Sequence, residues 1–322
     1  MTMHYYFAPM EGVTSYLYRR AHHQCFPGVD KYFMPFFATN QDHVFPRRAL
    51  QDILPAHNEG IPAVPQLLTR RAEDFIWAAG ELAAMGYREV NLNLGCPSGT
   101  VAAKGKGAGF LAFPEELDCF LGEIFSRVEM KISIKTRLGI REPEEFERLL
   151  EIYRRYPVAE LTIHPRVQKD FYRNHARRAW FGRALQAGGG PLCYNGDLVT
   201  AQDCRGLQAQ FPALEAVMLG RGLVASPDLV TRLKGGPAAG KADLRSFHDQ
   251  LYHSHCVGFG SDRSAMLRMK EIWFYLIHRF RDGERYAKQL RKATDTRVFE
   301  SVVAAIFRDL ELLEEANGGY LG

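Results

Sequence analysis

The chain has 322 residues, of which 46% are hydrophobic and 24% charged, a composition typical of a globular protein with one large and one smaller domain. Its six cysteines form no CxxC pair and have no regular spacing, which argues against a zinc cluster or a disulfide framework. No segment approaches the roughly 20 apolar residues of a membrane span, and no signal-peptide pattern opens the chain. We expect a cytoplasmic monomer without a membrane partner or a bound metal.

The net charge of +4 is unevenly distributed along the chain. Residues 263–297 contain ten Lys or Arg and four Asp or Glu, an excess of six positive charges, so the rest of the chain is slightly acidic. A cluster of this kind is either a solvated helical face or a surface that binds a polyanion such as nucleic acid.

Eight short β-rich segments alternate with helix-like segments along the first two thirds of the chain. The strand-like segments begin, in chain order, at His4, Asp30, Pro62, Glu89, Lys131, Ala159, Pro191 and Ala216. Amphipathic stretches such as residues 70–86 and 143–156 separate most of them. Eight alternations within about 230 residues predict an α/β fold of the (β/α)8 TIM-barrel type rather than an open doubly wound sheet.

The alternation ends at the Gly- and Pro-rich segment KGGPAAGK, residues 234–241, which is typical of a linker. Only helical periodicity follows, with one apolar stripe formed by Met269, Ile272, Trp273, Leu276 and Phe280. We predict a barrel over residues 1–234, a linker over 235–241 and a small C-terminal all-helical domain over 242–322. The basic cluster lies mostly on the outer side of that helical domain.

Alternation within the strands separates side chains that face the barrel interior from those that face the surrounding helices. Polar residues expected inside are Asn91, Asn93, Ser133, Lys135, Arg137, Thr162 and His164, with Arg166 just beyond and with Gln66 and Asn195 on two further strands. Taken singly, a strand-end amide can be a loop cap, Lys135 a surface lysine and His164 a core histidine. Active sites of barrels lie at the carboxyl ends of the strands. We therefore expect a polar, anionic ligand there.

Glycines and an arginine follow the last two predicted strands, in YNGDL (residues 194–198) and LGRG (residues 219–222). Barrels commonly bind phosphate at these two strand ends, through loop N–H groups and a helix N-terminus. The pair of segments therefore favours a phosphorylated ligand over two unrelated tight turns.

Cys96 lies in the segment NLNLGCPSGTVAAKGKGAGF, residues 91–110, directly above the fourth strand. Gly95 and Pro97 predict a tight, open turn, and the glycines that follow predict a mobile loop. We expect the other five cysteines to be small buried hydrophobes. The thiol of Cys96 could act as nucleophile, base or acid; no local His or Asn/His pair supports a protease-like thiolate, and the spacing leaves the rest open.

Seven motifs, in order along nearly the whole chain, resemble those of the tRNA-dihydrouridine synthases, flavin enzymes with this barrel and a C-terminal helical domain. The motifs are APMEGVT (8–14), PQLL (65–68), NLNLGCPS (91–98), KTR (135–137), HPR (164–166), NGD (195–197) and LGRG (219–222). The chain departs from the family at Pro165, where many members have glycine, and in the loop after Cys96. These departures leave the subfamily and the target uridine open.

The resemblance implies a tightly bound FMN and NADPH as its reductant. The residues implied for FMN are Pro9 and Met10 behind the isoalloxazine, Gln66 and Lys135 at its polar edge, His164 as a further support, and Asn195, Gly196, Asp197, Gly220 and Arg221 around the ribityl phosphate. The implied reaction adds a hydride from the flavin to C6 of a uridine and a proton from Cys96 to C5. A thiol suits this step because its ordinary pKa of about 8.5 leaves it protonated at neutral pH.

The resemblance also implies tRNA as the substrate, with Asn93 beside the bound uracil and with Arg137 and Arg166 as further substrate-binding residues. Extruding a uridine from folded RNA costs a few kcal/mol, and contacts to the RNA backbone must offset this cost. The cations expected to supply these contacts are Arg268, Lys270, Arg285, Lys288, Arg291 and Lys292. Whether Lys104 and Lys106 also touch RNA stays open.

Three other functions compete with this interpretation. A dihydroorotate dehydrogenase-like enzyme would oxidise a free pyrimidine with the loop cysteine as base, but it would not need the basic helical domain. An aldolase-like enzyme would use Lys135 as a Schiff-base lysine and contain no flavin. A non-catalytic RNA-binding protein would keep the fold without changing the dihydrouridine content of RNA.

Overall fold

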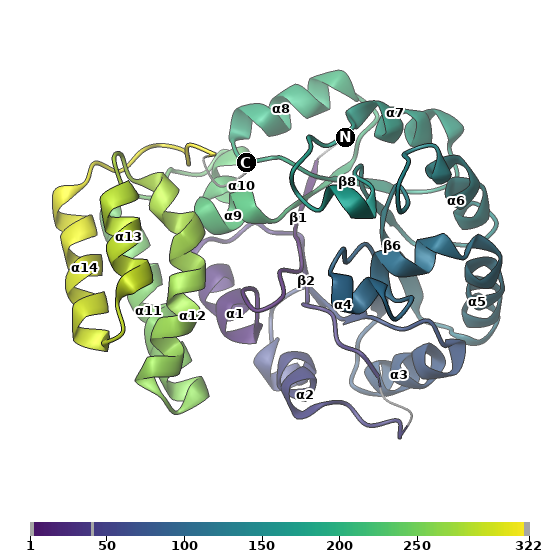
Figure 1. The fold of residues 1–322 in the computed structure, drawn as a ribbon, viewed down its shortest axis with the longest axis horizontal. Helices are drawn as coiled ribbons and strands as arrows, with labels where there is room; N and C mark the ends of the chain where they lie inside the picture. The colour runs from purple at the N-terminus through teal and green to yellow at the C-terminus, as the bar shows by residue number, and fades with distance from the viewer. Residues whose placement is uncertain (1–2, 40–41, 319–322) are drawn as a thin grey trace.

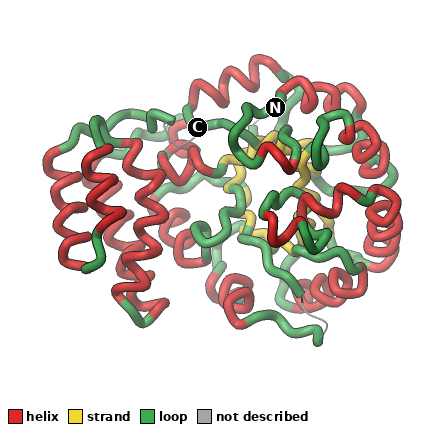
Figure 2. Tube along the Cα trace, in the orientation of Figure 1, coloured by secondary structure: helices red, strands yellow, loops and turns green. Residues whose placement is uncertain are grey.

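A ring of parallel strands forms the centre of the larger part of the molecule (Figures 1 and 2). This computed structural model describes residues 3–39 and 42–318. Its strands are β1 (His4–Phe7), β2 (Lys31–Phe33), β3 (Ala63–Val64), β4 (Gln66–Leu67), β5 (Glu89–Leu94), β6 (Lys131–Arg137), β7 (Leu161–His164), β8 (Leu192–Asn195) and β9 (Ala216–Leu219). Neighbours pair in the order β3-β2-β1-β9-β8-β7-β6-β5-β4, so the two ends of the sheet are β3 and β4.

Pro65 separates β3 from β4, and the two are halves of one predicted strand. Proline has no N–H to give to a ladder, but the carbonyl oxygen of Pro65 accepts from the N–H of Asn91 at 2.9 Å. Because β3 pairs with β2 and β4 pairs with β5, the chain itself closes the ring at this proline. The predicted (β/α)8 barrel is confirmed.

Most of the barrel helices surround the ring on its outer side (Figure 1). The barrel helices are α1 (Tyr16–Cys25), α2 (Arg47–Ile53), α3 (Ala72–Ala84), α4 (Gly99–Ala102), α5 (Pro114–Arg127), α6 (Glu145–Tyr153), α7 (Arg178–Ala187), α8 (Ala201–Gln210), α9 (Arg221–Ala225) and α10 (Leu229–Leu233). Short 3-10 helices are η1 (Pro55–His57), η2 (Gly107–Ala112) and η3 (Gln168–Asp170). None of the helices within the described ranges is long and apolar enough to cross a membrane.

Two hydrophobic cores reflect the predicted alternation of the strands. Leu92, Ile134 and Ile163 are buried in the larger core with the surrounding helices. A smaller core inside the ring consists of Tyr6, Ala8, Phe33, Val64, Cys193, Ala216 and Met218. These residues fill one part of the barrel interior.

Four helices at the C-terminal side form a separate bundle, on the left of Figure 1. They are α11 (Lys241–Phe259), α12 (Asp262–Leu276), α13 (Glu284–Lys292) and α14 (Thr296–Asp309), with η4 (Ile277–Arg279) after α12. All five residues of the predicted apolar stripe are buried. The bundle packs on the barrel through α11 against α1 and through α12 against α9.

Buried ion pairs fix the bundle on the barrel. Arg279, fully buried at the end of η4, donates to the Asp228 carboxylate beside α10 at 3.2 Å, and Arg232 donates to the same oxygen at 3.1 Å. Arg232 also donates to Glu315 at 2.8 Å, in a tail that returns from α14 to the barrel. This tail therefore contacts the barrel although it follows the helical bundle in the chain. The domain limits 1–234, 235–241 and 242–322 stay a prediction.

Candidate active site

A cavity of about 480 Å³ opens at the carboxyl ends of the barrel strands. The predicted site residues that line it are Pro9, Met10, Gln66, Asn93, Cys96, Lys135, Arg137, His164, Asn195, Gly196, Asp197, Gly220 and Arg221. They come from loops and strand ends that span more than 200 residues of sequence. Folding therefore gathers every residue that was predicted to hold the cofactor, together with the predicted catalytic cysteine.

A chain of buried hydrogen bonds crosses the barrel interior below this cavity. Ser133 donates to Glu89 at 2.7 Å, and Asn91 donates to the Ser133 hydroxyl at 2.9 Å. Gln66 then donates to Asn91 at 2.8 Å, and Asn93 donates to Gln66 at 2.7 Å. The three amides are buried, and each lost bond leaves a partner unsatisfied. The chain therefore fixes the position of Asn93 at the cavity.

Asn93 in turn holds the turn that carries Cys96. Its side-chain oxygen accepts from the backbone N–H groups of Gly95 at 3.0 Å and Cys96 at 2.9 Å. From the other side, the Arg137 Nε atom donates to the Gly95 carbonyl at 2.9 Å, and the N–H of Ala108 donates to the Cys96 carbonyl at 3.1 Å. The thiol therefore stands on a turn whose backbone groups are bonded on both sides.

The segment after Cys96 differs from the mobile loop expected from its glycines. It forms α4 and η2, and Ala108, Phe110 and Leu111 are buried. A Cβ atom at Gly109 would lie 2.4 Å from the Ala102 carbonyl oxygen. The glycine at this position permits a close approach of two backbone segments, which the sequence alone could not distinguish from flexibility.

Electrostatics keeps the Cys96 thiol protonated. Burial raises its pKa, and the Ser98 backbone, Arg137 and Lys135 oppose this shift only in part. Burial, helped by the charge of Arg137, lowers the pKa of Lys135 to about 8. Among the described residues that line the cavity, Cys96 is the one cysteine, and it lies beside two cations.

His164 is neutral in this setting. Burial, together with the charges of Arg137 and Lys135, lowers its pKa well below the usual value. Its Nε2 atom lies 2.9 Å from an Arg166 N–H, and because a guanidinium can only donate, Nε2 must accept. The proton of the ring therefore resides on Nδ1, which makes His164 a hydrogen-bond donor at that atom.

Arg166 and Asp197 form an ion pair among the residues predicted to bind phosphate. Arg166 donates to Asp197 at 2.7 Å and lies buried behind His164, outside the cavity lining. Asp197, with a φ of 48°, also accepts from Arg221 at 3.2 Å. The carboxylate thus orients Arg221 toward the cavity. The substrate contact predicted for Arg166 stays a prediction, because the structure shows its guanidinium bonded to the protein.

Sequence reasoning missed four aromatic residues of the cavity wall, namely Phe36, Tyr172, Phe274 and Tyr275. The Tyr172 ring lies 5.5 Å from the Arg137 guanidinium and 4.8 Å from that of Arg221. It follows β7 in a segment without strand periodicity, and its only sequence signal is the aromatic pair Phe171–Tyr172 between basic residues. Phe274 and Tyr275 come from α12, which was predicted to belong to a separate module.

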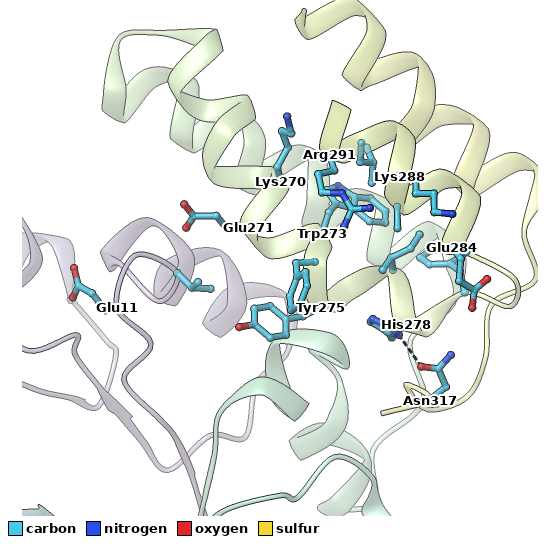
Figure 3. A pocket seen from close by; sticks show the side chains of 17 residues that line it. Glu11, Lys270, Glu271, Trp273, Tyr275, His278, Glu284, Lys288, Arg291 and Asn317 are labelled. Carbon is cyan, nitrogen blue, oxygen red and sulfur yellow. Dashed lines mark hydrogen bonds between the residues drawn. The ribbon is translucent and has the colours of Figure 1, made fainter. Parts of the chain in front are cut away.

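The six predicted RNA-contacting cations lie at different places on the bundle. Lys270, Lys288 and Arg291 line a second cavity beside α12 and α13 (Figure 3). The Arg268 guanidinium lies close to Gly12 in the loop after β1. Arg285 and Lys292 are exposed on α13. No group of three or more His, Cys, Asp or Glu within residues 3–39 and 42–318 could hold a metal ion.

Replacing Asn91 with leucine tests the hydrogen-bond chain. Asn91→Leu keeps the branched side-chain shape but leaves the Gln66 N–H group that donated to Asn91 without an acceptor, and it removes the donor to the Ser133 hydroxyl. We therefore expect the free energy of unfolding to fall by about 1 to 3 kcal/mol. Urea denaturation measures the loss. The neighbouring Leu92→Met is a volume-conserving control and should cost less than about 1.5 kcal/mol. Equal stability of the two variants would contradict a structural role for the chain.

Comparisons with known proteins identify similar sequences of bacterial origin. The chain is 28% identical over 230 residues, 70% of its length and 63% of the other, to a protein of Synechocystis named "Probable tRNA-dihydrouridine synthase 1". It is 26% identical to proteins named "tRNA-dihydrouridine(16) synthase" from Neisseria meningitidis, over 78% of both chains, and Pseudomonas putida, over 89% of this chain and 92% of the other.

Solved structures share the barrel at low sequence identity. A 2-naphthoyl-CoA reductase complex matches with a TM-score of 0.56 and 11% identity, over 73% of this chain and 50% of that one. Morphinone reductase matches with a TM-score of 0.51 and 15% identity, over 76% and 88%. These two show the fold alone. The profile of the family described as "Dihydrouridine synthase (Dus)" matches residues 6–316, so the chain belongs to the dihydrouridine synthase family.

Proposed function

We propose that the protein is an FMN-dependent tRNA-dihydrouridine synthase that uses NADPH to reduce the C5=C6 bond of a uridine in tRNA. The observation that carries the proposal is Cys96, the one cysteine among the described residues that line the cavity, fixed on a hydrogen-bonded turn beside Lys135 and Arg137. The names of the relatives supply the substrate class.

The cavity residues fit a phosphorylated flavin. The volume of the cavity, about 480 Å³, lies within the roughly 300–1,000 Å³ usual for ligand pockets. Lys135 and Gln66 would bond the polar edge of the ring system, and His164 would donate from Nδ1. Pro9 and Met10 line the wall where the ring would rest. Bound FMN would supply the hydride for C6.

Phosphate would be held where the loops after β8 and β9 meet. Gly222 packs so closely on the first loop that a Cβ atom there would lie 2.3 Å from the Leu198 carbonyl oxygen. Gly196 and Gly220 line the cavity beside Arg221 and Asn195. Asp197 would act through Arg221, since a carboxylate repels phosphate and the ion pair at 3.2 Å orients the guanidinium.

The surroundings of Cys96 suit a general acid. Burial disfavours the thiolate before the reaction, which keeps a proton available at neutral pH. Once the proton has passed to C5, the positive charges of Lys135 and Arg137 stabilise the thiolate that remains. Asn93 and Arg137 hold the turn, so they would position Cys96 in addition to any contact with the uracil.

The RNA would lie across the bundle and the barrel mouth. The six predicted cations remain our candidates for phosphate contacts, of which Lys288 and Arg291 combine exposure with a place beside the second cavity. Three relatives carry the position 16 in their names. We therefore take uridine 16 of tRNA as the target, and we retain a cytoplasmic monomer as part of the proposal.

The two half-reactions of the FMN-loaded protein test the function. NADPH should bleach the flavin absorbance of both the wild type and Cys96→Ala, because the thiol takes no part in that step. Unmodified tRNA should then reoxidise the flavin of the wild type and restore its absorbance. The rate of this reoxidation should be at least about 10²-fold lower in Cys96→Ala. Cys119→Ala is the control; Cys119 is exposed, not buried as expected from the sequence. Reoxidation by orotate but not by tRNA would contradict the proposal and favour a small-molecule dehydrogenase.

Lys135 should make FMN binding depend on pH. Its ammonium group is present below a pKa of about 8 and is lost above it, so the affinity of the apoprotein for FMN should fall about tenfold between pH 7 and pH 9. Fluorescence titration with FMN measures the affinity. Lys135→Met should bind more weakly and lose this pH dependence. A dependence that persists in Lys135→Met would assign it to another group.

A further inference from the structure

The second cavity, of about 670 Å³, adjoins the candidate active site. It lies between α12, α13 and the loop after β1, and Figure 3 shows Tyr275 and Glu11 on its barrel side. Four residues line both cavities, namely Glu11, Val13, Phe274 and Tyr275. The two cavities are therefore separated by this shared wall alone. A ligand that extends from the active site past the wall would enter the second cavity.

The second cavity combines an apolar floor with cations at its edge. Trp273, Ile277, Phe280 and Leu290 are buried and form the floor. The edge carries Lys270, Lys288 and Arg291, of which Lys288 and Arg291 are exposed.

Acidic side chains also line the second cavity, but two of the three are paired. Glu11 pairs with Arg48 at 3.2 Å, and Glu271 pairs with Arg268. The remaining carboxylate, Glu284, lines the same cavity as three lysine or arginine side chains. The balance at the rim favours an anionic ligand with an apolar part.

Phe274 is the unusual residue of the shared wall. It is 56% exposed, although large apolar side chains are usually buried. Its ring lies at 89° to the ring of Tyr275, with 5.0 Å between the ring centroids. Such a ring, exposed beside cations, is the surface on which nucleic-acid bases stack.

We propose that Phe274 stacks against the base of the nucleotide next to the target uridine, with the phosphate of that nucleotide near Lys288 and Arg291. This inference rests on the proposed function, because it takes the occupant to be the same RNA strand. Extrusion of the target uridine unstacks its neighbour, and the shared wall offers the neighbouring base a new partner. The helical bundle then holds the RNA by a base as well as by its phosphates.

Phe274→Ala tests the stacking contact with little risk to folding, because the side chain is largely exposed. The probes are an unmodified tRNA transcript and two transcripts that are abasic on one side or the other of the target uridine. Phe274→Ala should weaken binding of the intact transcript at least about fivefold. It should bind one of the abasic transcripts as tightly as the wild type does. Phe274→Trp should restore binding of the intact transcript.

Val298→Ala, at a position 50% exposed on α14, is the matched control and should bind all three transcripts like the wild type. Equal affinity of wild type and Phe274→Ala for the intact transcript would overturn the inference. So would a raised KM for NADPH with unchanged RNA affinity, since the cavity would then hold the dinucleotide. Absence of flavin reoxidation by tRNA in the wild type would instead refute the proposed function.

Discussion

The position of Cys96 depends on a row of buried amides in the barrel. Asn91, Gln66 and Asn93 pass hydrogen bonds from one strand to the next, and the last of them accepts from the N–H of Cys96. These amides are buried, and an unmade bond of a buried amide is costly. The Cys96 thiol is therefore located by the barrel itself, and the segment that follows it packs onto the turn through Ala108.

Positive charge is concentrated at two places in the molecule, the cavity at the barrel mouth and the helical bundle. Inside the mouth, Lys135, Arg137 and Arg221 lie close together around neutral His164, so the site favours an anionic ligand and a developing thiolate. Outside, the bundle carries the excess of basic residues, and the buried pair of Arg279 with Asp228 holds it beside the barrel mouth. A nucleic acid could thus contact both surfaces at once.

The sequence predicted the strands and the inward residues well because their patterns are local. Period-two alternation placed Asn91, Asn93 and Lys135 correctly, and glycines marked the ends of β8 and β9. These local patterns could not predict contacts between segments that lie far apart in the sequence. The burial of Arg166 behind His164, the packing of Gly109 on α4, and the approach of Phe274 to the barrel depend on tertiary geometry. Aromatic residues of the wall were missed for the same reason, since no strand or helix periodicity marks a shared wall.

The most direct measurement is a map of dihydrouridine at single-nucleotide resolution. Unmodified tRNA would be incubated with FMN-loaded protein and NADPH, with Cys96→Ala in parallel. Reduction of uridine 16 by the wild type, and not by the variant, is the result predicted from the fixed thiol and from the relatives that share the family. Unchanged uridine throughout the tRNA, or equal reduction by Cys96→Ala, would contradict the assignment of this cavity as the site of proton transfer to a tRNA uridine.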